Sequence, residues 1–192
     1  MFALRPTPPT PWQPLTDSEW AALLPLLRPG APLGRPPQNL RRTWDAIFWV
    51  ASSRTPWHHL PAHLGRADTA HRALRRAARA GLLDRLLIAV SRHPLATEPL
   101  AALEWRIARA WRRAARLMSF ASLSLARRLG MASALPAPPD CIPDPTLSET
   151  IKRLSKMLVA EIREGRGQPL FAPLKALIRA ARGNPRRWRL TA

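Results

Sequence analysis

Proline constrains this chain more than any other residue type, because 22 prolines divide it into segments that cannot form one continuous helix or sheet. Residues 1–14 contain five prolines, which predicts an extended arm without helical periodicity. Five more lie at 135–145, within a stretch (131–145) that we expect to be a linker or a rigid turn. Between and after these breaks the periodicity is helical, without sustained two-residue alternation, so the chain is predicted to be all-α.

Capping signals indicate where the helices of the first half begin and end. Thr16 and Glu19 have the spacing of a capping box, with Leu15 placed to pack onto Trp20. Asp68 or Thr69 is expected to cap the fourth segment, which Gly81 ends. The predicted segments are 16–28, 39–53, a short turn of helix at 57–64 closed by Gly65, 68–80 and 82–90.

The second half reads as further amphipathic helices. Residues 97–130 are predicted to be one long helix, with an apolar stripe and a basic one formed by Arg106, Arg109, Arg113 and Arg116. After the linker, the segment 146–192 begins with a second predicted capping box, Thr146 and Glu149. A last helix is expected at about 171–182, before a basic tail. This half is interpreted as a dimerisation or partner-docking module or as additional core, with binding to an acidic membrane surface ranked below these.

The charge balance points to an anionic partner. Lys and Arg number 31 against 12 acids, a formal net charge of +19, and only three of the 31 are lysine. Arginine binds phosphate with a planar, two-pronged guanidinium, so an excess of this kind favours a polyanion such as nucleic acid. The alternative is that abundant arginine, alanine and proline reflect a GC-rich genome.

The segment 68–80 is the most informative helix. Ala70, Leu74 and Ala77 share one side, and four arginines at i, i+3, i+4 and i+7 share another: Arg72, Arg75, Arg76 and Arg79. A short helix, a glycine turn and a cationic helix are the arrangement of a helix-turn-helix, whose second helix enters the major groove of DNA. The alternative is a basic helix face that only contacts solvent.

From Leu15 to about Leu87, the sequence resembles the small N-terminal domain of DDE-type insertion-sequence transposases. The matching words are LTDSEWAALLPLL at 15–27, GRP at 34–36, LRRTWDAIFWV at 40–50, PWHHLP at 56–61, Gly65, and the arginine series from Thr69 to Gly81. The resemblance implies a helix-turn-helix domain at 15–91 that binds the terminal DNA of a mobile element. It places Arg72, Arg75, Arg76 and Arg79 on the cationic helix, and Arg35 on a basic loop that is similar to half of a minor-groove hook, with a plain turn as the alternative.

The sequence also departs from the family pattern. Family members usually carry Arg-Thr-Gly just before the Pro-Trp pair, where this chain has Ser53-Arg54-Thr55 ahead of Pro56. At positions around the cationic helix where the family has aromatic residues, this chain has Ala67, His71 and Ala77. Losing a buried aromatic costs about 3–5 kcal/mol if nothing refills the space, so either the second half fills it or the domain has drifted.

Catalysis by this chain is not expected. A DDE nuclease holds two metal ions with three carboxylates on a mixed sheet. After residue 96 the acids lie in the proline-rich stretch or on predicted helices, and no strand is predicted to carry them. His59 and His63 lack a carboxylate or cysteine nearby to complete a metal site, and Cys141 has no cation beside it to activate the thiol. We therefore predict no catalytic residues, no metal and no cofactor.

The predicted function is non-catalytic binding of double-stranded DNA, as a truncated transposase, an element regulator or a domesticated binder. One alternative is a helical interaction or scaffold protein; another is the DNA-binding subunit of a split transposase. The partners expected besides DNA are a second copy of the chain or a separate catalytic transposase subunit, with no membrane. Because no apolar segment of a secretory signal is visible, the expected location is the bacterial cytoplasm, at the nucleoid when DNA is bound.

Overall fold

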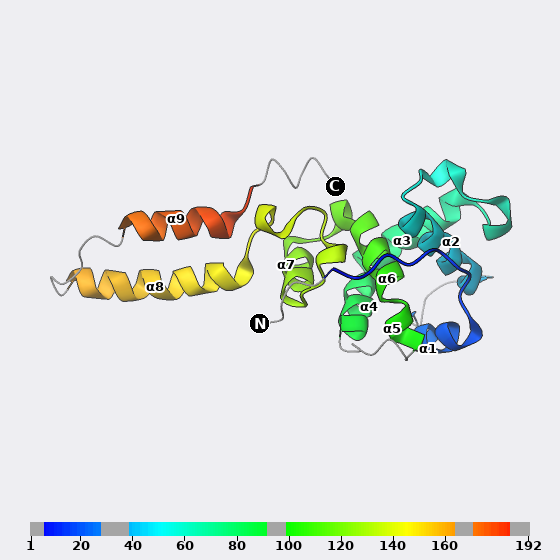
Figure 1. The fold of residues 1–192 in the computed structure, drawn as a ribbon, viewed down its shortest axis with the longest axis horizontal. Coiled ribbons are helices and arrows are strands. Elements are labelled where there is room, and N and C mark those ends of the chain that lie inside the picture. Colours follow the sequence, from blue (N-terminus) through cyan, green and yellow to red (C-terminus); the bar gives the residue numbers. More distant parts are fainter. Residues whose placement is uncertain (1–5, 28–38, 92–98, 164–170, 185–192) are drawn as a thin grey trace. The chain divides into compact units, whose positions relative to one another are not determined.

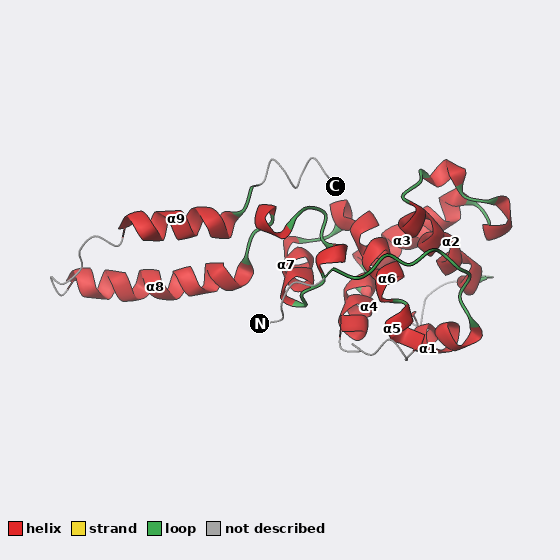
Figure 2. Cartoon of the chain, viewed as in Figure 1, coloured by secondary structure: helices red, strands yellow, loops and turns green. Residues whose placement is uncertain are grey.

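The computed structural model describes residues 6–27, 39–91, 99–163 and 171–184. Within these residues, every regular element is a helix or a short helical turn, and no strand is present (Figures 1 and 2). The predicted all-α class is confirmed. The chain divides into two compact units, a larger one at Phe2–Leu135 and a smaller one at Pro136–Ala192, and each is described by itself.

The larger unit is built around α6. Its helices are α1 (Asp17–Leu27), α2 (Leu40–Ser53), α3 (Ala67–Arg79), α4 (Leu82–Ser91), α5 (Pro99–Ala102), α6 (Glu104–Arg113) and α7 (Phe120–Arg128). α6 packs against α2 and α4, and its Ile107 and Trp111 are fully buried with Phe48 and Leu86 of those helices. A helix that follows the predicted DNA-binding domain in sequence is therefore part of the same core, which agrees with the expectation that later residues supply additional core.

The first helix begins as its sequence predicts. The Thr16 N–H donates to Glu19 Oε2 at 2.8 Å, and the Glu19 N–H donates to Thr16 Oγ1 at 3.1 Å, which is the reciprocal pairing of a capping box. Leu15, before the cap, is buried, and its N–H donates to Asp45 Oδ1 at 2.8 Å. The start of α1 is therefore attached to α2 by a buried hydrogen bond as well as by apolar contact.

The proline-rich N-terminal segment is extended, as expected, but it is attached to the core. The Thr7 side chain is buried and donates to Glu104 Oε1 at 2.6 Å, and the Thr7 N–H donates to Ser133 Oγ at 2.8 Å. Farther along, Trp12 Nε1 donates to the Asp45 carbonyl at 3.2 Å. Each of these attachments uses at least one side chain, that of Thr7, Ser133 or Trp12.

The prediction of one long helix at 97–130 is wrong. This segment contains α5, α6, a 3₁₀ turn at Ala115–Leu117 and α7. The chain is extended at Met118, and Ser119 then caps α7 by accepting from the Ser122 N–H at 3.1 Å. Asp84 of α4 accepts from Trp111 of α6 at 2.8 Å and from Ser122 of α7 at 2.6 Å, so one carboxylate fixes both helices after the break.

The smaller unit contains the antiparallel pair α8 (Pro145–Arg163) and α9 (Phe171–Arg182), which lie side by side (Figure 1). The bounds of α9 are those expected from the sequence. The predicted capping box at Thr146 is wrong: Asp144 caps α8, since Asp144 Oδ1 accepts from the N–H groups of Thr146 and Leu147 at 3.0 Å. Pro145 takes the first helical position, where its missing N–H costs nothing.

The residues just before α8 and the C-terminal end of α9 are joined by backbone hydrogen bonds. The Asp144 N–H donates to the Ala181 carbonyl at 2.8 Å, and the Asn184 N–H donates to the Cys141 carbonyl at 2.8 Å. Gly183 between them has a φ of 66°, and a Cβ there would lie 2.5 Å from the Cys141 carbonyl oxygen. The residues expected to form a linker or rigid turn thus form a turn that requires glycine opposite it.

The two helices leave apolar side chains in solvent. Ile151 and Leu158 of α8 and Ala181 of α9 are buried. The exposed large apolar residues are Leu154, Met157, Val159, Ile162, Leu177 and Ile178. Among the helices that the structure describes, none has the length and apolar character required to cross a membrane.

Candidate nucleic-acid interface

The cationic helix α3 is the centre of the candidate interface. It begins at Ala67, after Arg66, which provides no side-chain cap. The expected cap at Asp68 or Thr69 is therefore wrong, because the chain is already helical there. Asp68 still stabilises the first turn, where a negative charge interacts favourably with the helix dipole, and it pairs with Arg72 at 3.1 Å.

One face of α3 is fixed in the core. Ala70, Leu74, Ala77 and Ala78 are buried, and the helix packs against α2 and α4. The helix ends at Arg79, and Gly81, just after the C-cap residue Ala80, has a φ of 66°, the left-handed conformation that glycine adopts without steric cost. The predicted apolar face and glycine stop of this helix are confirmed, so the orientation of its outer face is fixed by packing.

The outer face of α3 carries the predicted DNA-contact residues. Arg72, Arg75, Arg76 and Arg79 are all exposed. Asp68, which is also exposed, is the acid of this helix. Arg35, the other predicted contact residue, lies outside the described residues. Local periodicity was sufficient to place the four arginines together.

The short turn of helix expected at 57–64 is present as 3₁₀ turns closed by Gly65, and not as one α-helix. Residues 57–64 form two separate 3₁₀ turns, Trp57–His59 and Ala62–Leu64, interrupted at Leu60 and Pro61. Both turns begin after a proline, Pro56 or Pro61, and neither is extended into an α-helix. The helix that precedes α3 and packs on it is α2, so the two-helix arrangement is α2, a loop at 54–66, and α3.

Aromatic side chains border α3 on its His71 side. The Trp57 ring lies 5.2 Å from the His71 ring, and the Arg113 guanidinium of α6 lies 5.7 Å from the Trp57 ring centre. Arg113 Nη2 also donates to the Thr55 carbonyl at 3.1 Å. Sequence reasoning missed this contact because it links residues 58 positions apart.

The predicted basic stripe of residues 97–130 is only partly exposed to solvent: Arg113 and Arg116 are exposed, whereas Arg106 and Arg109 are not. Arg106 is buried in an ion pair with Glu19, at 3.3 Å between Nη1 and Oε2. Arg109 is partly buried, donates to the Ala51 carbonyl at 3.3 Å and lies 5.5 Å from the Trp105 ring centre. Burial lowers the pKa of Arg109 to about 10, with the charges of Arg112, Arg54 and Arg113 adding to the effect. Arg109 is still a cation at neutral pH.

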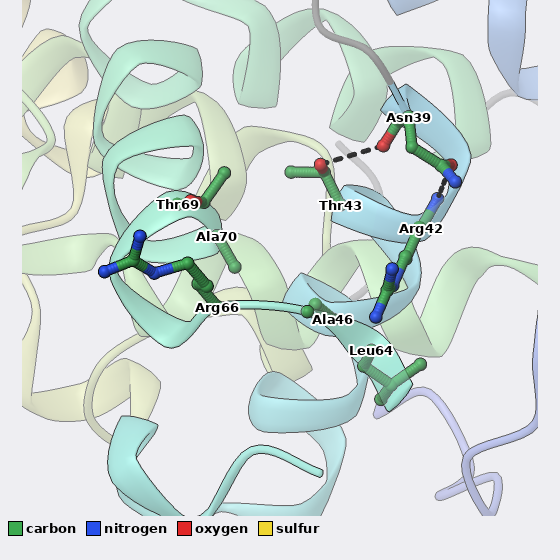
Figure 3. Close-up of a pocket in the computed structure, with 9 residues that line it drawn as sticks. Asn39, Arg42, Thr43, Ala46, Leu64, Arg66, Thr69 and Ala70 are labelled. Atoms are coloured by element: carbon green, nitrogen blue, oxygen red, sulfur yellow. Dashed lines mark hydrogen bonds between the residues drawn. The ribbon is translucent and has the colours of Figure 1, made fainter. Parts of the chain in front are cut away.

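A small pocket lies between α2 and the start of α3 (Figure 3). Its volume is about 240 Å³, and Arg42 and Arg66 contribute cationic side chains to its wall. Asn39 Oδ1 caps α2 by accepting from the Arg42 N–H at 3.0 Å, and Arg42 Nη2 donates to the Ala62 carbonyl at 3.1 Å. The remaining lining residues are Asn39, Thr43, Ala46, Leu64, Gly65, Thr69 and Ala70, so this wall contains no acid.

His58 and His59 belong to the 3₁₀ turn Trp57–His59, which packs against α3. His58 and His59 are exposed, and their rings are 4.2 Å apart in an edge-on arrangement. Across the described parts of the chain, no group of three His, Cys, Asp or Glu side chains is arranged to hold a metal ion.

Comparison with known proteins agrees with the resemblance seen in the sequence. Residues 15–87 match the family described as "Putative transposase of IS4/5 family (DUF4096)". The match includes α1, α2, α3 and the first part of α4, so this part of the chain is transposase-related. No curated protein and no solved structure matches the chain.

Proposed function

We propose that this protein is a non-catalytic DNA-binding protein of transposase origin, and that α3 lies against DNA. The observation that carries the proposal is the exposed row Arg72, Arg75, Arg76 and Arg79 on a helix whose opposite face is buried. An α-helix fits the major groove of B-form DNA, and arginine can bind both phosphate oxygens and the O6 and N7 atoms of guanine. The transposase match over residues 15–87 supports the same assignment.

Cations beside α3 would hold the DNA backbone. Arg66, immediately before the helix, is exposed, and together with Arg42 it lines the pocket between α2 and α3. Contacts to phosphate set the position of a protein on DNA without reading its sequence. We therefore assign base or phosphate contact to the four α3 arginines and phosphate contact to Arg42 and Arg66.

We propose that the described part of this chain does not cleave DNA strands. Several of its carboxylates already have structural roles: Glu19 caps α1, Asp84 fixes α6 and α7, and Asp144 caps α8. The protein would act as a truncated transposase, an element regulator or a domesticated binder. As the subunit of a split transposase, it would deliver a separate nuclease to DNA.

The experiment is a titration of duplex DNA with the full-length protein at several salt concentrations. Neutralising about six phosphates gives a slope near −5 in a plot of log affinity against log salt, because each contact releases condensed counterions. No binding at low salt, or a flat response, contradicts the proposal. The alternative would then be a helical interaction protein, for which the exposed apolar residues of α8 and α9 are the supporting observation.

A further inference from the structure

The residue after α2 adopts an unfavourable backbone conformation. Arg54 has a φ of 60° and a ψ of 13°, in the left-handed region. The other described residues with positive φ are Gly65, Gly81, Gly130 and Gly183. Glycine has no Cβ to clash in this region, whereas an arginine there is strained. The presence of arginine at this position therefore requires an explanation other than the turn itself.

Capping of α2 does not supply that explanation. Cations stabilise the C-terminal end of a helix, but here Arg109 donates to the Ala51 carbonyl and Arg113 donates to the Thr55 carbonyl. Within the described part of the chain, the exposed Arg54 guanidinium forms no hydrogen bond. Its charge is therefore available to a ligand.

Arg54, Arg109 and Arg113 form a group of like charges, here called the Arg54 cluster. No carboxylate among the described residues forms an ion pair with any of the three. Burial lowers the pKa of Arg113 and, together with repulsion from Arg112, Arg54 and Arg113, that of Arg109. Partly desolvated cations that repel one another create a positive potential that an anion would relieve.

The cluster adjoins the arginine face of α3. Arg113 lies over Trp57, and Trp57 lies against His71 on the side of α3. His71 is followed directly by Arg72, the first residue of the exposed row. The cluster therefore lies beside α3, on the His71 side of the helix.

We propose that Arg54 and Arg113 bind a backbone phosphate of the DNA that α3 contacts, with Arg109 adding to the positive potential. This inference rests on the proposed function, because the ligand is a phosphodiester of the same duplex. Arginine is suited to the contact, since its planar guanidinium matches two phosphate oxygens. The strained backbone at Arg54 would then be retained for binding rather than for stability.

The test is Arg54→Gly in the full-length chain, measured in two ways. Thermal unfolding should move to a higher midpoint, because glycine removes the strain. Affinity for duplex DNA should fall, and the slope of log affinity against log salt should decrease by about one, as expected for one lost phosphate contact. Arg54→Lys keeps the charge and should retain most of the slope, and Arg153→Gln, which removes one exposed charge from α8, should leave it unchanged.

Two results would overturn the inference. If Arg54→Gly binds DNA with the unaltered slope while replacement of the α3 arginines abolishes binding, the proposed function stands and the phosphate contact at Arg54 is wrong. If the unaltered protein does not bind DNA at all, the proposed function and this inference both fail.

Discussion

Glu19 of α1 and Arg106 of α6 form a buried ion pair, with only 6% and 5% of these residues exposed. Glu19 also completes the capping box of α1, so one carboxylate both starts a helix and joins it to the central helix of the larger unit. Arg106 Nε has no partner, so the pair is incompletely hydrogen-bonded. The pair therefore fixes the position of α1 at a cost in desolvation.

Replacing Glu19 with Gln should strongly destabilise the protein, because Arg106 would remain charged and buried without a counterion. Breaking a buried pair in this way costs about 3–5 kcal/mol in the free energy of unfolding, measurable by chemical denaturation. Asp17→Asn is the matched control, since Asp17 pairs with Arg41 at the surface. Exposed pairs contribute about 0–1 kcal/mol, and equal losses in the two variants would refute the assignment.

Asp45 should make stability fall as pH rises through the acidic range. Burial raises the pKa of Asp45 above the ordinary 3.8. The hydrogen bond from the Leu15 N–H and the charges of Arg41 and Arg106 lower the pKa, but their effect is smaller than that of burial. The folded state therefore holds the proton more tightly than the unfolded state between 3.8 and the raised pKa. Asp45→Asn keeps an acceptor for Leu15, so it should unfold like the unaltered protein below this window and be more stable above it. A constant difference at every pH would contradict this.

Substitutions at Asp144 and Thr146 test which of the two residues caps α8. Asp144→Ala should lower stability by about 0.5–2 kcal/mol, because two N–H groups of the first turn lose their acceptor. Thr146→Ala should have a much smaller effect, since Thr146 is exposed and follows the cap. If thermal or denaturant unfolding showed a larger loss of stability for Thr146→Ala than for Asp144→Ala, the capping box expected from the sequence would be correct.

Features set by a few neighbouring residues were predictable from the sequence. The capping box of α1, the apolar face of α3 and the bounds of α9 depend on local spacing, which sequence displays directly. The arginines of α6 show the limit of such reasoning. Arg106 and Arg109 have the same helical spacing as Arg72 and Arg75, yet the first pair lies against other helices and the second pair faces solvent.

The break at 114–119 and the Arg54 cluster were not predictable for the same reason. Both depend on contacts between distant segments: Asp84 with Trp111 and Ser122, and Arg113 with Thr55. The departure at Ser53-Arg54-Thr55 was visible in the sequence, but only the left-handed φ of Arg54 shows that it affects the backbone. Periodicity identifies a helix face without identifying its neighbour.

Incubation of the full-length protein with Mg²⁺ or Mn²⁺ and DNA carrying candidate element ends should leave both strands intact. The expectation follows from the structural roles of the described carboxylates. Strand products on a denaturing gel that disappear in Glu104→Gln or Glu161→Gln, in protein that remains folded, would show that the second half has a catalytic role.

The most direct test of the account compares two variants that each lose four positive charges. One carries Gln at Arg72, Arg75, Arg76 and Arg79 of α3; the other carries Gln at the exposed Lys152, Arg153, Lys156 and Arg163 of α8. Because all eight side chains are exposed, both variants should keep their helix content and unfold within about 0.5 kcal/mol of the unaltered protein. The account predicts that the α3 variant loses DNA affinity and about one unit of salt slope for each arginine that neutralises a phosphate, while the α8 variant keeps both. A larger loss in the α8 variant would contradict the assignment of DNA binding to α3.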